Sequence, residues 1–574
     1  FQIYKENKKL IILYLQYDLK LNSFMKLNLV KINKIIRNPL FLLFVVFVAG
    51  VFLRLFNIWD NFTFGYDQGR DAQRILDIVN FKNFKLVGQE TDIPGIFHGA
   101  LSYYVLALVY FIGNFNANYP AIFLSIINAL GIFLVYYFSV LLFKDKRIGL
   151  VAGLLWAVSY EQANFSRFIS NASAMSIVSI IFFLGLAIFL FKKKNWGLTL
   201  SVIGLALSVQ LNFYLIFLSV FYIIFYFIYR PRIEKKFIFF NFILLLFLFS
   251  PYIIAELKWN FMMSKSLISY VTSHKGSLDL IGSLSRYITK TSEAFYFSFL
   301  AIDKLFVIPI FLAFTAFAFV KIKENKIKYF FFIWLFSTLP LFLFSSGVLE
   351  TQLINTTLFP PLTILFAYFL IEFVLKRKLI LLIIALLLII ASNYSLFYKD
   401  GFKEIKLLSI QNFTLKDEKN LIDYTYQSSK GKEFSICALT NPLYVNVLWS
   451  YLYGTYGKDK YGYVPYWAGQ EQVISSNNLP YDKKHVPLRY LIIEPASGIP
   501  DYAKPVFVYM EDNTSSLVAE KKFSDLVVQK RTLNTDLSIF NDTQGLNNKE
   551  ILSIKSVINS NPRFSCYTTY NSDN

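Results

Sequence analysis

A short charged cluster follows the first apolar run of the chain and has the residue types needed for catalysis. The run extends from about residue 40 to 58, and Asp67, Arg70 and Asp71 lie just beyond it. Carboxylates are costly at the edge of a bilayer, so this placement indicates a site for a metal, a sugar or a proton. Asp67 could accept a proton from an attacking hydroxyl or hold a divalent cation. On a helix, Asp71 would share its face, but a solvated amphipathic helix laced by ion pairs explains the spacing equally well.

Other charged residues stand where outer loops are expected and could complete such a site. Arg167 and Arg286 could bind a lipid phosphate through the bidentate guanidinium group. His98 lies in the same loop as Asp67, and Glu256 and Glu350 each follow an apolar span. The commoner explanation for the two glutamates is capping at the ends of spans.

Two basic residues lie within or beside apolar segments. Arg54 falls inside the first span, about one turn before its outer end, so we expect it to pair with a carboxylate or to reach the interface. Lys258 follows an apolar segment, and snorkelling of its side chain is the simpler explanation.

The composition places the chain among polytopic membrane proteins. Of 574 residues, 55% are hydrophobic, and the mean hydropathy is +0.47. A soluble domain has no core able to hide so much apolar surface. The formal net charge of +20 could suggest nucleic acid, but the Lys and Arg residues form small groups between apolar runs and no basic stripe.

Eleven apolar runs are near the length needed to span a bilayer. They predict spans at about 39–58, 119–143, 148–165, 172–191, 195–210, 213–229, 237–255, 296–320, 329–345, 357–375 and 379–397. The short basic linkers between them predict the cytoplasmic side: 144–147, 192–194, 230–236, 321–328 and 376–378. All five fall inside, on the same side as the basic flank 31–37, only if the twelve-residue apolar run 101–112 does not cross; if it crossed, all five would lie outside. We therefore expect residues 60–118 to form one outer loop with a surface helix.

The expected organisation has three parts. Residues 1–38 form a cytoplasmic segment, of which 1–24 precede the first methionine, Met25, and are expected to be an over-long gene prediction or the edge of a fragment. Residues 39–398 form an all-α transmembrane domain. Residues 399–574 form an extracytoplasmic α/β domain, because their apolar runs shorten to strand length at 434–439, 490–494 and 505–509. Its two cysteines, Cys437 and Cys566, could form a disulfide on an oxidising side or stay free in a reducing setting.

Several signatures of soluble enzymes are missing from the sequence. It contains no Walker A loop, no dinucleotide glycine fingerprint after a strand, no His-Glu-x-x-His and no Cys-x-x-Cys. This argues against an ATP-driven pump or a zinc protease and favours chemistry driven by a molecule already in the membrane.

The same residues resemble those of a known family, the GT-C membrane glycosyltransferases, in particular the bacterial group of protein O-mannosyltransferases, aminoarabinose transferases and Rgt-type sugar transferases. The resemblance covers about 51–398. It rests on Arg54 in the first span, Tyr66 to Ala72, Gly95 to Tyr104 before the surface helix, Lys144 to Arg147, Ser166 to Phe168, and Pro251 to Phe261.

The resemblance implies a bundle of about eleven to thirteen spans in the plasma membrane of a bacterium. It also implies a polyprenyl-phosphate sugar donor, an acceptor that is a lipid, a glycan or a protein, and transfer with inversion on the outer side. Asp67 falls where the family carries its catalytic Asp, as a base or as a metal-holding carboxylate. The sequence departs from the family at Gln68, where Glu is common, at Ala100, where Pro is common, and at Thr351-Gln352.

Two other functions are consistent with the sequence. A lipid-linked sugar flippase or polysaccharide exporter would have a similar span count, but we expect polar groups at the bilayer midplane and paired repeats in such a transporter. A membrane-anchored assembly protein whose tail does the binding would leave the Asp67 loop without a role.

Overall fold

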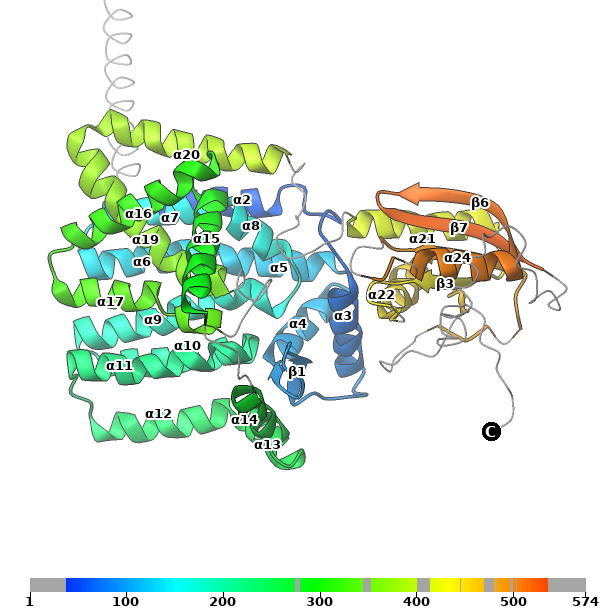
Figure 1. Cartoon of the computed structure of the whole chain (residues 1–574), viewed down its shortest axis with the longest axis horizontal. Helices are drawn as coiled ribbons and strands as arrows, with labels where there is room; N and C mark the ends of the chain where they lie inside the picture. Colours follow the sequence, from blue (N-terminus) through cyan, green and yellow to red (C-terminus); the bar gives the residue numbers. More distant parts are fainter. Residues whose placement is uncertain are drawn as a thin grey trace, which may run out of the picture.

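The structure is a computed structural model and consists of a helical bundle, an outer layer and a small α/β domain (Figure 1). It describes residues 38–273, 279–343, 353–399, 413–443, 445–468, 479–482, 484–495, 499–501 and 503–534. In Figure 1 the outer layer, which contains α3, α4 and β1, lies between the bundle and the α/β domain.

The bundle is built from apolar helices. Its elements are α2 (Pro39–Leu55), α5 (Asn118–Ala129), α6 (Gly131–Phe143), α7 (Lys146–Val158), α8 (Tyr160–Arg167), η1 (Asn171–Ala174), α9 (Met175–Lys192), α10 (Trp196–Leu211), η2 (Phe213–Ser219), α11 (Val220–Tyr229), α12 (Lys235–Leu248), α13 (Ser250–Lys258), α14 (Met262–Ser273), α15 (Leu280–Ser298), α16 (Lys304–Lys321), α17 (Asn325–Leu335), η3 (Leu339–Leu343), η4 (Ile354–Leu358), α19 (Phe359–Phe369), η5 (Leu370–Leu375) and α20 (Leu379–Lys399). Within the described ranges, five helices are long and apolar enough to cross a membrane, or six if the bent pair α12–α13 is one span.

The predicted spans coincide with these helices or helix pairs, with one difference in bounds. The span predicted at 296–320 is wrong at its start, because α15 continues to Ser298 and a separate helix, α16, begins at Lys304. The Asp303 carboxylate accepts a hydrogen bond from the Leu305 N–H at 2.9 Å. This side-chain cap fixes the start of α16, and an apolar run alone does not reveal it.

The basic linkers gather at one end of the bundle. Asn195, between α9 and α10, donates to Glu234, between α11 and α12, at 2.5 Å. The Tyr229 hydroxyl bonds the Lys326 carbonyl, and Tyr368 bonds the Lys321 carbonyl at 3.1 Å. Figure 1 shows the α11–α12 linker at the end opposite α3 and α4. The basic linkers and the outer layer therefore lie at opposite ends of the bundle, as expected if residues 101–112 do not cross the membrane.

The outer layer contains four short elements: α3 (Tyr66–Val79), β1 (Val87–Glu90), β2 (Phe97–Gly99) and α4 (Leu101–Ile112). The two strands pair antiparallel, with Val87 opposite Gly99. Helix α4 has the bounds of the predicted surface helix. Gly99 allows β2 to approach α10, because a Cβ there would lie 2.7 Å from the Cα of Gln210.

The α/β domain has a five-stranded mixed sheet in the order β4-β3-β5-β7-β6. Strands β3, β4 and β5 are parallel, and β7 pairs antiparallel with both β5 and β6. Its elements are α21 (Leu415–Ser429), β3 (Ser435–Leu439), α22 (Val447–Leu452), η6 (Tyr453–Gly457), α23 (Lys458–Tyr461), β4 (Tyr466–Trp467), β5 (Leu488–Ile493), α24 (Ala503–Thr514), β6 (Ser515–Phe523) and β7 (Leu526–Leu533). Cys437, on β3, is disulfide-bonded; Cys566 lies outside the described residues.

The strand predicted at 505–509 is wrong, because these residues belong to helix α24. Pro505 falls in the first turn of that helix, where its missing N–H costs no hydrogen bond. Ala503 and Val506 are buried on one side of it. A run of five apolar residues cannot by itself distinguish a strand from a buried helical segment.

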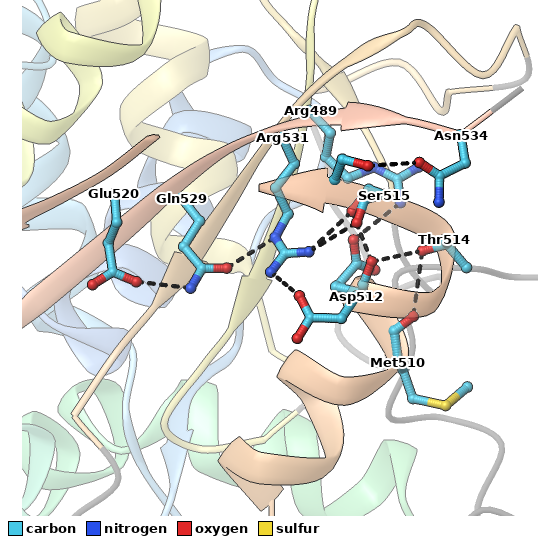
Figure 2. A network of polar contacts seen from close by, with 11 residues as sticks. Arg489, Met510, Asp512, Thr514, Ser515, Glu520, Gln529, Arg531 and Asn534 are labelled. Atoms are coloured by element: carbon cyan, nitrogen blue, oxygen red, sulfur yellow. Dashed lines mark hydrogen bonds and ion pairs between the residues drawn. The ribbon is translucent and has the colours of Figure 1, made fainter. Parts of the chain in front are cut away.

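Two buried arginines lie on the paired strands β5 and β7 of this sheet. Arg489 on β5 and Arg531 on β7 are directly opposite each other and each is only 1% exposed. Figure 2 shows Arg531 between the Asp512 carboxylate, at 2.5 Å, and the Gln529 side-chain oxygen, at 2.9 Å. Arg489 lies 3.4 Å from Glu511. Buried charges need such partners.

The α/β domain docks on the outer layer through backbone and side-chain contacts. The Leu415 N–H donates to the Phe62 carbonyl at 3.0 Å, and Lys419 forms a 2.5 Å ion pair with Asp60. Helix α22 packs against α3 so closely that a Cβ on Gly69 would lie 2.7 Å from the Cα of Leu448. The domain and the outer loop therefore occupy the same end of the protein.

Candidate functional site

The candidate site is at the start of α3, where Asp67 occupies the first turn. The Gln68 side chain accepts a hydrogen bond from the Gly65 N–H at 2.9 Å, which fixes the beginning of the helix. A carboxylate in the first turn is favoured by the helix dipole. The Asp67 side chain is 60% exposed, so its carboxylate is accessible to a substrate.

Arg70 joins the two aspartates that the sequence singled out. Its Nη1 lies 2.7 Å from Asp67 Oδ1, and its Nε lies 2.9 Å from Asp71 Oδ1. The Tyr103 hydroxyl on α4 donates to Asp71 at 3.0 Å and accepts from Arg74 at 2.8 Å. The predicted proximity of Asp67, Arg70 and Asp71 is therefore present, but Asp71 is mostly enclosed at 17% exposure. Asp67 is the more accessible carboxylate.

A chain of amide side chains ties Arg70 to the end of the bundle. Arg70 Nη2 donates to Gln89 Oε1 on β1 at 2.7 Å. Gln89 donates in turn to Asn171 at 3.3 Å, and Asn171 donates to the Leu211 carbonyl at 2.5 Å. This chain connects α3 with η1 and α10 and helps to fix the position of the guanidinium group that contacts Asp67.

His98 lies on β2, within electrostatic range of Asp71 and Arg70, and is 8% exposed. Its Nδ1 accepts a hydrogen bond from the Phe213 N–H at 3.1 Å. Burial lowers the pKa of His98 to about 4, with Asp71 opposing and Arg70 reinforcing the shift. The imidazole is therefore neutral at pH 7, and with Nδ1 accepting, its proton sits on Nε2.

The charged side chains of α3 shift one another's pKa values. Desolvation raises the pKa of Asp67, while Arg70 opposes the shift and Asp71 adds to it. Burial alone would lower the pKa of Arg70, but Asp71 and Asp67 together outweigh it and raise that pKa above its ordinary value. Asp67 is thus a stronger base than an ordinary aspartate, and Arg70 stays charged.

Arg54 and Arg167 lie fully buried beneath this layer and bond backbone carbonyls. Arg54 donates to the Ala157 and Trp156 carbonyls at 3.1 and 3.0 Å and to Asn128 Oδ1 at 3.1 Å. The expected carboxylate partner or interface position for Arg54 is therefore wrong: the guanidinium is fully buried and bonds the Gly50 carbonyl of its own helix, two carbonyl oxygens where α7 ends and one amide. The reason is that helix ends leave carbonyls unsatisfied, and a guanidinium can bond several of them.

Arg167 performs the reciprocal task at the end of α2. It donates to the Arg54, Leu53 and Phe56 carbonyls at 3.0, 3.1 and 2.8 Å and is 0% exposed. These contacts direct it to the protein backbone. Its predicted phosphate contact stays a prediction.

Of the remaining predicted site residues, Glu256 and Arg286 form hydrogen bonds with parts of the chain other than α3. The Glu256 carboxylate accepts from the Met263 N–H at 2.8 Å and from the Ser264 hydroxyl at 2.6 Å, at the start of α14. Arg286 on α15 donates to the Phe342 carbonyl at 2.7 Å. Glu350 lies outside the described residues. Glu256 thus makes the capping contacts that the sequence analysis kept as the commoner explanation, and substrate roles for all three remain predictions.

The residues around Asp67 do not fit a divalent metal ion. Arg70 occupies the space between Asp67 and Asp71 and supplies positive charge. Within the described part of the chain, no group of three or more His, Cys, Asp or Glu side chains gathers as metal ligands do.

Sequence reasoning did not include Tyr103, Gln89, Asn171 or Arg74 among the site residues. Gln89 and Asn171 are 82 positions apart, and amides are common surface residues, so no local pattern identifies them. Tyr103 opens the surface helix in the stretch that carries the family resemblance, and its place there was the one available signal.

The fold matches that of a solved protein. The crystal structure of ArnT from Cupriavidus metallidurans bound to undecaprenyl phosphate superposes with a TM-score of 0.56 at 11% identity, covering 85% of this chain and 97% of that chain. The apo structure of the same protein gives 0.54 at 12% identity, with the same coverage. No protein-family model and no curated protein matches the sequence. The GT-C-like fold expected from the sequence is therefore confirmed as a fold.

Proposed function

We propose that the protein is a membrane glycosyltransferase that moves a sugar from a polyprenyl-phosphate donor to an acceptor on the extracytoplasmic face, with inversion. The observation that carries the proposal is Asp67: an accessible carboxylate of raised pKa, at the end of a bundle with the ArnT fold. That one ArnT structure contains undecaprenyl phosphate supports a lipid-phosphate donor here.

The proposed mechanism uses Asp67 as the general base. A carboxylate of raised pKa can remove the proton from an acceptor hydroxyl while that oxygen attacks the anomeric carbon. The lipid phosphate leaves from the opposite face of the sugar, so one displacement inverts the anomeric centre and needs no covalent enzyme intermediate. Arg70 holds the Asp67 carboxylate in place through the 2.7 Å contact.

Positive and hydrogen-bonding groups of α3 and β2 would stabilise the departing phosphate. Arg70 keeps its charge, and His98 carries a proton on Nε2. We propose these two groups for that role. The donor phosphate would then lie over β2 and α3, and the acceptor on the exposed side of Asp67.

The proposed topology follows the positive-inside rule. It has eleven spans, with the basic linkers in the cytoplasm and the outer layer and α/β domain outside the cytoplasm. The protein would then be a multi-pass protein of a bacterial plasma membrane. Its acceptor is a lipid, a glycan or a protein.

Sugar transfer in proteoliposomes tests the proposal directly. Purified protein is supplied with a pool of radiolabelled polyprenyl-phosphate sugars and membrane acceptors, and wild type is compared with Asp67→Asn. Loss of general-base catalysis predicts a decrease of about 10²–10⁴-fold in rate. The control is Asp92→Asn, which removes an exposed carboxylate from the same loop and should leave the rate unchanged.

Two outcomes would contradict the proposal. Equal rates for wild type and folded Asp67→Asn would remove Asp67 from the chemistry. If wild type transferred no sugar but moved the lipid-linked sugar across vesicles, the protein would be a flippase.

A further inference from the structure

An apolar cavity lies at the opposite end of the bundle from Asp67. It has a volume of about 580 Å³, lies between α9, α10, α11 and α12, and is open to the outside of the bundle. Its lining is almost entirely hydrocarbon, from Leu186 and Leu190 on α9 to Phe242 on α12. This volume is within the range of about 300–1,000 Å³ that is typical of ligand pockets.

The polar side chains of the lining are mostly engaged with the protein. The Tyr222 hydroxyl lies 2.6 Å from the Ser201 hydroxyl, and Asn241 donates to the Phe237 carbonyl at 2.8 Å. Ile238 and Phe242, on the outer side of the cavity, are more than half exposed. The cavity thus offers an apolar surface to a chain of carbon atoms and little to a polar ligand.

The rim of the cavity is strongly basic. Pro231 and Ile233 line the cavity and alternate in sequence with Arg230, Arg232 and Glu234. The Asn195–Glu234 hydrogen bond of 2.5 Å brings the α9–α10 linker to the same rim. The two linkers contain seven exposed cations and a single acid: Lys192, Lys193, Lys194, Arg230, Arg232, Lys235 and Lys236 against Glu234.

We propose that this cavity binds an anionic phospholipid, with an acyl chain between α10, α11 and α12 and the phosphate at the basic rim. Charge complementarity selects the headgroup, because basic residues at the membrane surface attract anionic lipids. The apolar lining selects a hydrocarbon chain. This site is separate from the proposed donor site, which is at the other end of the bundle, and does not depend on it.

Lipid retention measured by native mass spectrometry tests the proposal. The full-length protein is stripped of lipid and exposed to equal amounts of phosphatidylglycerol and phosphatidylcholine with identical acyl chains. We expect wild type to retain phosphatidylglycerol with a preference of about tenfold or more, since each Lys or Arg near an anionic surface contributes roughly fivefold.

Two variants and a matched control separate the rim from the cavity. Arg232→Gln/Lys235→Gln/Lys236→Gln should abolish the preference, and Val202→Phe, which fills the cavity, should reduce retention of both lipids. The control Lys376→Gln/Arg377→Gln/Lys378→Gln removes the same charge from another exposed basic linker and should behave as wild type. Thermal unfolding of each variant verifies that it is folded.

Three results would overturn the proposal. Equal loss in the rim variant and the control would mean that the protein attracts anionic lipid only through its overall charge. Equal retention of both lipids by wild type would mean that the cavity is a non-selective apolar surface. Displacement of phosphatidylglycerol by added polyprenyl phosphate, at equal concentration, would assign the cavity to that lipid instead.

Discussion

The outer layer and the interior balance their charges in different ways. On α3, Arg70 lies between two carboxylates, one of them 60% exposed. Inside the bundle, Arg54 and Arg167 bond backbone carbonyls at the ends of α7 and α2. An arginine next to carboxylates can tune a reaction, whereas an arginine that bonds helix ends stabilises the fold.

The interior of the α/β domain accommodates its acidic side chains in a third way. Glu418 is fully buried and neither of its carboxylate oxygens has a hydrogen-bond partner among the described residues. Burial, followed by the Glu494 charge, raises its pKa well above the ordinary value. Burial also raises the pKa of Glu494 to about 7. Glu418 thus avoids the cost of a buried charge by holding its proton, whereas Glu494 accepts hydrogen bonds from the Asn441 N–H and the Trp449 indole N–H, each at 2.8 Å, and is partly ionised near pH 7.

The largest expected effect is the loss of a buried arginine. Arg54→Ala would leave the Ala157 and Trp156 carbonyls without these bonds in a low-dielectric region, and we expect a destabilisation of about 3–5 kcal/mol. Thermal unfolding in detergent, followed by size exclusion, measures it. Arg147→Ala, which removes an exposed ion pair with Asp145, should have little effect. If the two variants unfold alike, Arg54 is not a structural residue.

The next effect is a pH dependence of the α/β domain. A carboxyl group whose pKa is raised on folding stabilises the protein fully below its unfolded pKa, and that contribution is lost as pH rises through the folded pKa. For Glu494, the free energy of unfolding should therefore decrease as the pH rises from about 4.5 to above 7, by roughly 3 kcal/mol at most. Thermal unfolding across this range should show a flatter dependence for Glu494→Gln. A stability that rises with pH through this window would contradict the assignment.

A smaller effect should follow from a change behind α3. Gly69→Val places carbon atoms against the Leu448 backbone, which cannot move without displacing α22. We expect a cost of about 1–3 kcal/mol, together with faster proteolysis between the bundle and the α/β domain. Gly153→Ala is the control, because the two atoms nearest its Cβ would be side-chain carbons of Ile132 and Leu43, each at 3.3 Å. Unchanged proteolysis in Gly69→Val would show that α22 does not hold α3.

The smallest effect is a shift in the pH profile of sugar transfer. Arg70 lowers the pKa of Asp67, so Arg70→Gln should raise that pKa and move the acidic limb of the profile to higher pH, by up to about one unit. Because the Arg70 side chain is only 12% exposed and also bonds Asp71 and Gln89, thermal unfolding of the variant must first verify that it is folded. An acidic limb that moves to lower pH would contradict the proposed role of Asp67 as the base.

The class of fold was predictable because it depends on patterns that are local in sequence. Apolar runs and basic linkers predicted a polytopic helical protein, and the length of residues 101–112 predicted the short helix α4. The predictions failed where a local pattern is ambiguous. The strand at 505–509 is a helix, because five apolar residues fit either period, and the start of α16 depends on a side-chain cap.

The candidate site was predictable only in part. Asp67, Arg70 and Asp71 are close in sequence, so helical spacing alone suggested their contact. Gln89, Tyr103 and Asn171 come from three other elements and join the network through tertiary contacts.

The sequence by itself determined the apolar helices, the clustering of the basic linkers and the charged start of α3, because hydrophobicity and helical periodicity act over short distances. Only the tertiary structure decided what each charged residue does. Arg54, Arg70 and Arg167 are the same residue type, but they have different partners, and some of these partners are as far as 114 positions away in the sequence. Partner identity, rather than residue type, separates a structural arginine from one that can serve a reaction.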